Sequence, residues 1–158
     1  MKMINEMGTA KKPSREETVP VFKPEIVVLF CRHCVVPDAD LTIAAKANSR
    51  FQAKLVMMPC TKKVEASHLL KILAQGADGV EVVGCPFQQC QTLSGSLQAE
   101  KRLEHARRLL RESGLEAERL GMERGLNLSG LQLVLLAEKR ADAVRPLGPN
   151  PVKGTRIQ

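Results

Sequence analysis

Short apolar runs alternate along the chain with longer segments whose apolar residues recur at helical spacing. The three clearest runs are Ile26–Phe30, Lys54–Met58 and Val80–Val83. Their near-continuous apolar character is typical of strands that are covered on both faces of a sheet. A fourth strand is predicted over Leu115–Met122. Helices are predicted between and after these runs, over Asp38–Arg50, Glu65–Gln75, Ser96–Ser113 and Asn127–Val144.

This alternation of strand and helix predicts an α/β fold. Parallel strands joined by right-handed helical crossovers give an open, mostly parallel four-stranded sheet with helices on both faces. We expect the strand order 2-1-3-4, with the first strand at the switch point. In that order the loops that follow strands 1, 2 and 3 lie side by side at one edge of the sheet.

The 158 residues suit one domain with arms at both ends. Residues 1–24 are polar and contain three prolines, so they are predicted to be a flexible arm. Residues 25–145 form the folded domain. Residues 146–158 are again rich in proline and glycine and are predicted to be a flexible tail.

The net charge of +7 first suggests a nucleic-acid partner. Residues 1–24 carry +2 and residues 145–158 carry +3, however, which leaves only +2 for the body between them. The chain has no Trp or Tyr and only four Phe, so it lacks the aromatic platform on which single-stranded bases stack. We therefore expect no nucleic acid among the partners.

No apolar stretch reaches the ~18 residues that a membrane span requires, and the N-terminus has no apolar signal segment. We expect no membrane insertion. Five cysteines, an odd number, without an export signal indicate a reduced compartment and a metal or redox role for the thiols. The expected location is the cytoplasm.

The cysteines follow the predicted strands. Cys31 and Cys34 come directly after the first run, Cys60 after the second, and Cys85 and Cys90 after the third. Because the carboxyl ends of parallel strands meet at one edge, the five thiols are expected to converge on one crevice. None of them lies inside an apolar run, which argues against a purely structural role as small buried hydrophobic residues.

Ligand count leaves the cofactor open at this point, because a zinc site and a [2Fe–2S] cluster each require four ligands. Four of the five cysteines are expected to serve. A dithiol oxidoreductase that uses Cys31 and Cys34 is a weaker alternative. The predicted helix begins beyond Cys34, and that mechanism leaves the other three thiols idle.

Polar neighbours of the thiols are candidates for supporting roles. His33 lies inside the C-x-x-C loop and is expected to donate a hydrogen bond to sulfur. Lys62 and Lys63, together with Arg32, could offset the negative charge of a thiolate-bound cluster and raise its potential. The alternative for the charged residues is an ordinary solvated loop.

Four stretches resemble the small delta subunit, an iron–sulfur subunit, of methyl-viologen-reducing, F420-non-reducing hydrogenases, which works with heterodisulfide reductase. The resemblance extends from about Ile26 to Pro149. It is carried by FCRHC (Phe30–Cys34), by MPCTKKVEASHLLKILAQGADGVEVVGC (Met58–Cys85), by Cys90 with GSLQAEKR (Gly95–Arg102), and by PLGP (Pro146–Pro149).

The resemblance implies a non-catalytic electron-transfer subunit that carries a [2Fe–2S] cluster. Its implied partners are a hydrogenase or dehydrogenase subunit and the flavin-bearing subunit of a heterodisulfide reductase-like complex. Cys85–Gln91 departs from the family's C-H-P-G-D-C-H arrangement, although the cysteine spacing is kept. Among the basic residues of the Ser96–Ser113 helix, Arg102, in the part of the helix near the thiol loop, is the predicted partner contact.

Overall fold

Four parallel strands form one open sheet in the computed structural model, which describes residues 21–42 and 50–153. The strands are β1 (Glu25–Cys31), β2 (Gln52–Met58), β3 (Gly79–Gly84) and β4 (Leu120–Arg124). Their order in the sheet is β2-β1-β3-β4, which confirms the prediction. In this register Cys31 lies opposite Met58 on β2, and Phe30 lies opposite Val83 on β3, so the strands end together.

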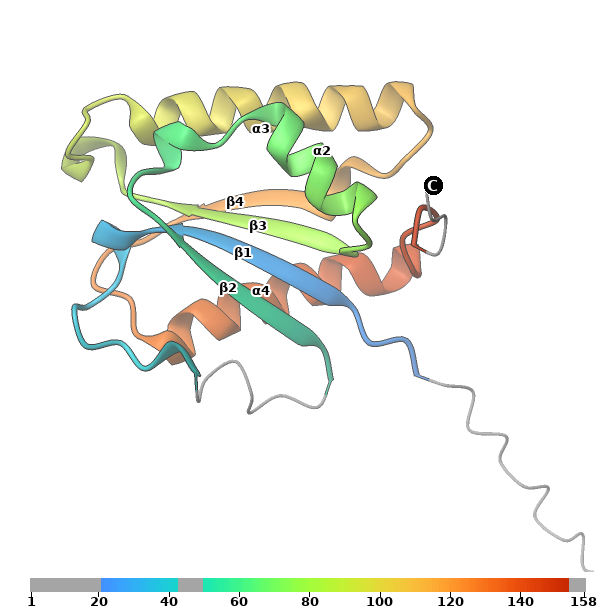
Figure 1. The fold of residues 1–158 in the computed structure, drawn as a ribbon, viewed down its shortest axis with the longest axis horizontal. Helices are drawn as coiled ribbons and strands as arrows, with labels where there is room; N and C mark the ends of the chain where they lie inside the picture. Colours follow the sequence, from blue (N-terminus) through green and yellow to red (C-terminus); the bar gives the residue numbers. More distant parts are fainter. Residues whose placement is uncertain (1–20, 43–49, 154–158) are drawn as a thin grey trace, which may run out of the picture.

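Helices cover both faces of the sheet. Helices α2 (Ala66–Ala74) and α3 (Gly95–Glu112) lie on one face, and α4 (Gly130–Val144) lies on the other (Figure 1). This confirms the predicted α/β class. The helix predicted over Asp38–Arg50 falls mostly on residues 43–49, which are outside the described residues.

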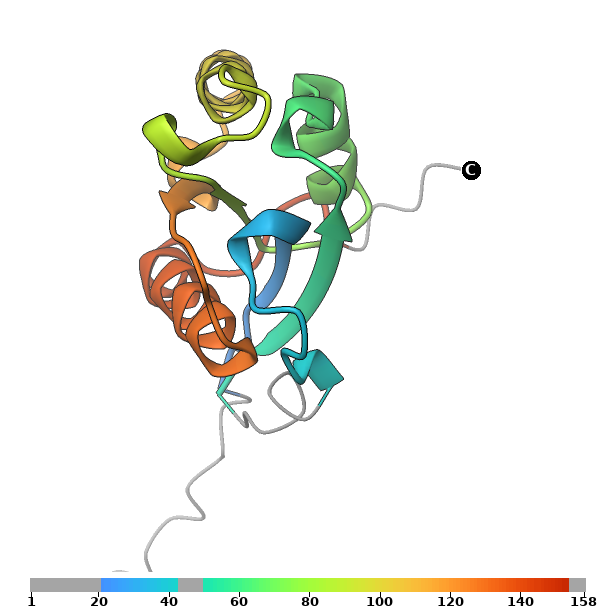
Figure 2. The ribbon, with the colours of Figure 1, turned by 90° about the vertical axis from the view of Figure 1, so that its left-hand side faces the viewer.

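A short 3₁₀ turn follows each of the first three strands. These turns are η1 (Arg32–Cys34), η2 (Thr61–Lys63) and η3 (Phe87–Gln89). Figure 2 looks at the end of the molecule where they gather, with η1 in blue between η2 in green and η3 in yellow-green. The switch in strand order therefore brings three loops that are distant in sequence to one edge of the sheet.

The core has one layer on each side of the sheet, because side chains alternate along β1. Val28 and Phe30 pack with Leu133 on the α4 side. Leu29 packs with Leu69 and Leu103 under α2 and α3 on the other side. Burial on both faces explains why the first and third strands read as near-continuous apolar runs.

Two elements begin at least three residues later than the sequence predicted. The fourth strand begins at Leu120 rather than Leu115, because η4 (Ala117–Arg119) turns the chain first and buries Arg119. Helix α4 begins at Gly130 rather than Asn127. The Ser129 side chain and the Gln132 side chain each accept the other residue's backbone N–H, and this capping box fixes the helix start.

The segment after α4 packs against the domain as far as residue 153, through η5 (Arg145–Leu147) and the residues that follow it. Asn150 is buried, and its side-chain amide donates to the carbonyl oxygens of Leu73 (2.8 Å) and Ala77 (2.7 Å). Its backbone N–H donates to the Asp78 carboxylate at 2.9 Å. Residues 146–153 are therefore packed against the domain and are not part of the flexible tail that the sequence predicted. The predicted N-terminal arm lies mostly outside the described residues.

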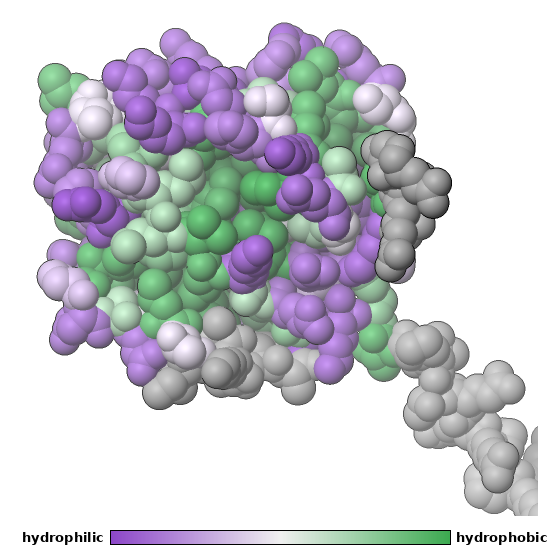
Figure 3. Space-filling model, in the orientation of Figure 1, coloured by the Kyte–Doolittle hydropathy of each residue, from purple (hydrophilic) through white to green (hydrophobic). Residues whose placement is uncertain are grey.

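Strand β2 is at the edge of the sheet, and no strand in the described part of the chain pairs with its outer side. Figure 3, in the orientation of Figure 1, shows apolar surface across the middle of this side, bordered above by polar residues. None of the helices in residues 21–42 and 50–153 has the length and apolarity needed to cross a bilayer.

Candidate metal centre

All five cysteines lie at the carboxyl edge of the sheet. Cys31 is the last residue of β1, and Cys34 closes η1. Cys60 caps η2, while Cys85 and Cys90 flank the loop that contains η3. The predicted convergence of the three loops therefore brings every thiol to one end of the molecule.

Three of the thiols form a tight group. The Cys85 sulfur lies 3.8 Å from that of Cys31 and 3.7 Å from that of Cys34. All three sulfurs lie within 4.8 Å of one another, and all three residues are buried. Three sulfurs at this spacing could hold a metal ion.

The other two thiols share a threonine. The Thr92 hydroxyl oxygen lies 3.5 Å from the Cys60 sulfur and 3.3 Å from the Cys90 sulfur. That oxygen already accepts the Gly95 backbone N–H at 3.1 Å, so its own hydrogen is free to point to either sulfur. Cys60 also accepts the Lys62 backbone N–H at 3.4 Å.

A small enclosed cavity of about 50 Å³ lies between the two groups of thiols. Its wall includes four of the five cysteines, namely Cys31, Cys60, Cys85 and Cys90, and also His33 and Thr92. Cys34 is not on this wall. Its sulfur lies 3.8 Å from the Val83 carbonyl oxygen, a position from which a protonated thiol can donate to that oxygen.

The surroundings favour ionisation at some thiols and oppose it at others. Contact with the Cys34 thiol lowers the pKa of Cys31. Burial acts in the opposite direction and raises it, while the His33 backbone N–H lowers it further. The Cys31 contact and burial raise the pKa of Cys34, and burial raises the pKa of Cys85. Thiolates are the metal-binding form, and among these three cysteines the surroundings favour the thiolate at Cys31.

Cys90 lies at the start of α3. Burial opposes its ionisation, but the Thr92 hydroxyl and the backbone N–H groups of Ser96, Thr92 and Gly95 outweigh burial and lower its pKa. The N–H groups at the start of α3 and the positive end of its helix dipole stabilise a thiolate at this position.

Glycine is required at residue 95 by this packing. A Cβ there would lie 2.4 Å from the Thr92 hydroxyl and 2.9 Å from the Cys60 sulfur. Sequence reasoning missed both Thr92 and Gly95. Their position between Cys90 and the predicted helix was the available signal, but a threonine and a glycine there are also ordinary loop residues.

The predicted supporting residues have mixed outcomes. His33 lines the cavity. Lys62 reaches Cys60 through its backbone N–H, and the Lys63 backbone N–H donates to the Cys60 carbonyl at 3.1 Å. Both lysine side chains are exposed. The two residues support the Cys60 turn through their backbone N–H groups.

Arg102 points inward, toward this same turn. Its guanidinium donates to the carbonyl oxygens of Lys62 (2.6 Å) and Val64 (3.0 Å) and lies 3.4 Å from the Glu65 carboxylate. This residue therefore ties the loop after Cys60 to helix α3. Because its guanidinium is engaged in this way, we do not propose it as the partner contact that the sequence suggested.

Arg124, which sequence reasoning did not single out, supports the loop between Cys85 and Cys90 in a similar way. Its guanidinium lies over the Phe87 ring, donates to the Ser96 hydroxyl at 3.2 Å, and pairs with Glu100 at 3.1 Å. The residue is at the end of β4, so it connects the thiol loop to the sheet and to the start of α3.

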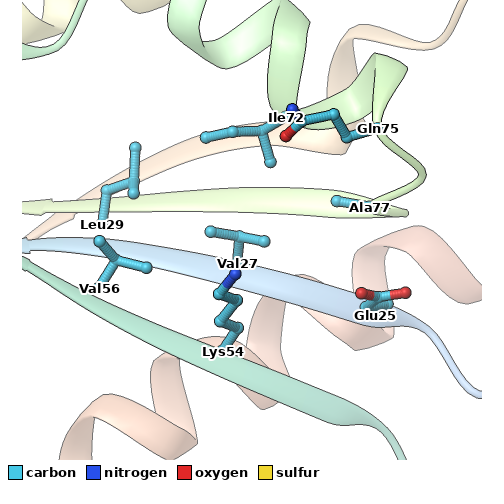
Figure 4. Close-up of a pocket in the computed structure, with 8 residues that line it drawn as sticks. All are labelled: Glu25, Val27, Leu29, Lys54, Val56, Ile72, Gln75 and Ala77. Carbon is cyan, nitrogen blue, oxygen red and sulfur yellow. The ribbon is translucent and has the colours of Figure 1, made fainter.

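A larger hollow of about 360 Å³ lies elsewhere, between α2 and the neighbouring strands β1 and β2 (Figure 4). Val27, Leu29 and Val56 form its apolar floor, with Lys54 and Gln75 at the rim. It contains no cysteine or histidine. The site with distinctive chemistry is therefore the smaller cavity among the thiols.

Comparison with known proteins gives the family of this chain. Residues 26–148 match the family described as the delta subunit of methyl-viologen-reducing hydrogenase. The chain is 31% identical over 128 residues to the iron-sulfur subunit of the F420-non-reducing hydrogenase of Archaeoglobus profundus, a match that covers 81% of this chain and 93% of that protein. The corresponding vhu iron-sulfur subunit of Methanocaldococcus jannaschii is also 31% identical, over 130 residues that cover 82% of this chain and 97% of the relative.

A second kind of relative is much longer. A subunit of the ferredoxin:CoB-CoM heterodisulfide reductase of Methanosarcina mazei is 30% identical over 97 residues, which cover 61% of this chain but only 12% of that protein. The match to the hydrogenase iron-sulfur subunits, by contrast, extends over nearly the whole length of each relative. This chain belongs to the delta-subunit family of the methyl-viologen-reducing hydrogenases.

Proposed function

We propose that this chain is an electron-transfer subunit that carries a [2Fe–2S] cluster in the cavity between the two groups of thiols. The observation that carries the proposal is that four cysteines line one small enclosed space. Cys31, Cys60, Cys85 and Cys90 would hold the cluster. Four thiolates are the donor set that such a cluster requires, and the cluster supplies one-electron chemistry when bound.

The electrostatics support this assignment. Cys31 and Cys90, whose pKa values are both lowered, lie in different thiol groups on either side of the cavity. Backbone N–H groups directed at the Cys60 and Cys90 sulfurs would stabilise a negatively charged centre. Cys34 is left as the fifth, non-ligand cysteine, which supports the wall from behind.

The relatives support a role inside a larger complex. Some relatives are hydrogenase subunits of about the length of this chain, and others are heterodisulfide reductase subunits in which the matching region is a small part. The partners we propose are a hydrogenase or dehydrogenase subunit and a heterodisulfide reductase-like flavin subunit. The chain would pass electrons between them in the cytoplasm, where thiols stay reduced.

A zinc-stabilised interaction module is the second candidate, and one observation favours it. The compact Cys31, Cys34 and Cys85 group has the spacing of a mononuclear site. The two candidates therefore use different ligands, since zinc would need Cys34 and the cluster would not. A dithiol oxidoreductase gains no support, because Cys31 is 2% exposed and offers no access to a substrate disulfide.

Anaerobic purification followed by metal analysis tests the proposal. We expect iron and acid-labile sulfide in equal amounts, cluster absorbance in the visible range, and a rhombic EPR signal after reduction. A colourless protein that contains stoichiometric zinc would support the interaction module instead.

A further inference from the structure

Three exposed apolar side chains lie on the segments that lead from the thiol loops into α3. Leu93 is 86% exposed, Phe87 48% and Leu97 40%. They come from the loop after β3, which carries Cys90, and from the first turn of α3, which begins at Gly95 beside the Cys60 sulfur. Cys60 is the least buried of the five cysteines, so this end gives the shortest route from the thiols to a neighbouring protein.

Leu93 has an unusual backbone as well as an exposed side chain. Its φ angle is 59°, in the left-handed region that a leucine rarely adopts. Its backbone N–H donates to the Cys90 carbonyl at 3.0 Å, which holds the loop in this conformation. An exposed apolar side chain on a strained backbone does not stabilise the protein in its unbound form. Strained positions of this kind are concentrated at functional sites.

The Phe87 ring is held by a contact within the chain. The Arg124 guanidinium lies 3.8 Å from the centroid of its ring, while the other side of this loop remains exposed. An aromatic side chain that is already fixed loses little entropy on binding and is a typical interface hot spot.

Helix α3 continues the surface with positive charge. Two of its three acidic residues are paired, Glu100 with Arg124 and Glu104 with Arg107, and the third is Glu112 at its end. Three exposed cations along the helix have no carboxylate partner among residues 21–42 and 50–153: Lys101, Arg108 and Arg111. They line a shallow groove together with Leu97, His105 and the two paired glutamates, Glu100 and Glu104.

We infer that this combined surface docks an acidic protein that exchanges electrons with the thiol site. We define the docking surface as Phe87, Leu93, Leu97, Lys101, Arg108 and Arg111. The apolar end would lie over Cys60 and Cys90, and the cations would steer and orient a partner with carboxylates around its redox centre. The inference rests on the proposed electron-transfer function and names the chemistry of the partner.

Calorimetric titration with an acidic [2Fe–2S] ferredoxin as the probe tests the surface directly. The basic protein cytochrome c serves as the comparison. We expect the ferredoxin to bind, with an affinity that falls as salt is added, and cytochrome c not to bind. Absence of ferredoxin binding, or equal binding of cytochrome c, would overturn the inference.

Two variants locate the binding. Leu93→Asn removes the apolar side chain but keeps a residue that tolerates a positive φ, so the loop should remain folded. We expect it to weaken ferredoxin binding about tenfold. The triple variant Lys101→Glu, Arg108→Glu, Arg111→Glu should weaken binding at low salt by at least about tenfold.

The matched controls are on other helices. Leu131→Asn removes a leucine that is 64% exposed on α4, and Lys71→Glu reverses an exposed charge on α2. Both should stay within about twofold of the unmodified chain. Equal losses in the controls and the test variants would contradict the inference. The calorimetric measurement of binding does not depend on the cluster. If the chain lacks a cluster but Leu93→Asn still weakens ferredoxin binding, the proposed function is refuted and the docking surface is supported.

Discussion

The guanidinium of Arg124 lies 3.8 Å from the centroid of the Phe87 ring and so holds the loop between Cys85 and Cys90 against the end of β4. The same group donates to the Ser96 hydroxyl at 3.2 Å, beside the start of α3. One side chain thus fixes both ends of the segment that presents Cys90.

Arg124→Gln should loosen this loop. We expect the free energy of unfolding to fall by about 1 kcal/mol, the usual size of a partly exposed cation–π and ion-pair contribution. Metal should be lost to a chelator faster, because Cys90 is less firmly held. Arg111→Gln, on the exposed face of α3, is the control. Chelator kinetics equal to those of the unmodified chain would show that the loop does not depend on Arg124.

Gly95→Ala should empty the site while leaving the fold in place. The new methyl group would lie 2.4 Å from the Thr92 hydroxyl and 2.9 Å from the Cys60 sulfur, so both must move. Alanine itself is well suited to a helix, so the far-ultraviolet circular dichroism should be unchanged. Metal content per chain is the measurement, with Ser94→Ala as the neighbouring control. Full metal content in Gly95→Ala would mean that the thiols lie elsewhere.

Glu81→Gln should change the dependence of stability on pH. Glu81 is buried on β3, and Arg140 donates to one of its carboxylate oxygens at 2.6 Å, while the other oxygen has no partner among the residues that the structure describes. Burial raises its pKa more than Arg140 lowers it. A raised pKa in the folded state means that this group stabilises the fold fully below its unfolded value of ~4.3 and less as the pH rises through the folded value.

Urea unfolding at a series of pH values tests this. As the pH rises from about 4 to 8, the unmodified chain should lose stability relative to Glu81→Gln. The variant also leaves Arg140 without its carboxylate, but that loss does not vary over this range because arginine stays protonated. Glu104→Gln, at an exposed position, should show no such change. A pH-independent difference for Glu81→Gln would contradict the assignment.

Asn150→Ala should destabilise the fold strongly, although the residue lies near the end of the described chain. The amide donates to the carbonyl oxygens of Leu73 and Ala77, which would be left buried without a partner. We expect a loss of about 2 kcal/mol in the free energy of unfolding. Gln52→Ala, at an exposed amide, is the control and should be within about 0.5 kcal/mol of the unmodified chain. An equally small effect for Asn150→Ala would show that the segment does not anchor the domain.

The strand order was predictable because the first three apolar runs are short, alternate with helical segments and end at cysteines. The start of the fourth strand was not. Leu115 looks like the beginning of an apolar run, but the buried Arg119 sits in a turn and donates to the carbonyl oxygens of Asp78 and Gly148 at 3.0 Å each. Such backbone partners, far apart in sequence, leave no trace in local periodicity.

The candidate site shows the same division. The arrival of all five thiols at one edge follows from topology, so it could be predicted. The inward orientation of Arg102 could not, because a basic residue on a polar helix face looks identical whether it meets water or the carbonyl oxygens of a nearby loop. Composition gave a wrong prediction at the C-terminal end. Proline and glycine there indicated a flexible tail, but Asn150 is buried and hydrogen-bonded to the domain.

The central claim is that the cluster lies among the four cysteines that line the cavity and that Cys34 stands behind its wall. EPR spectroscopy and iron analysis of Cys34→Ala and Cys60→Ala, purified anaerobically, test it most directly. We predict that Cys34→Ala keeps the iron content and reduced spectrum of the unmodified chain and that Cys60→Ala loses both. Loss of metal in Cys34→Ala together with retention in Cys60→Ala would contradict the account and place the metal on the compact group of Cys31, Cys34 and Cys85.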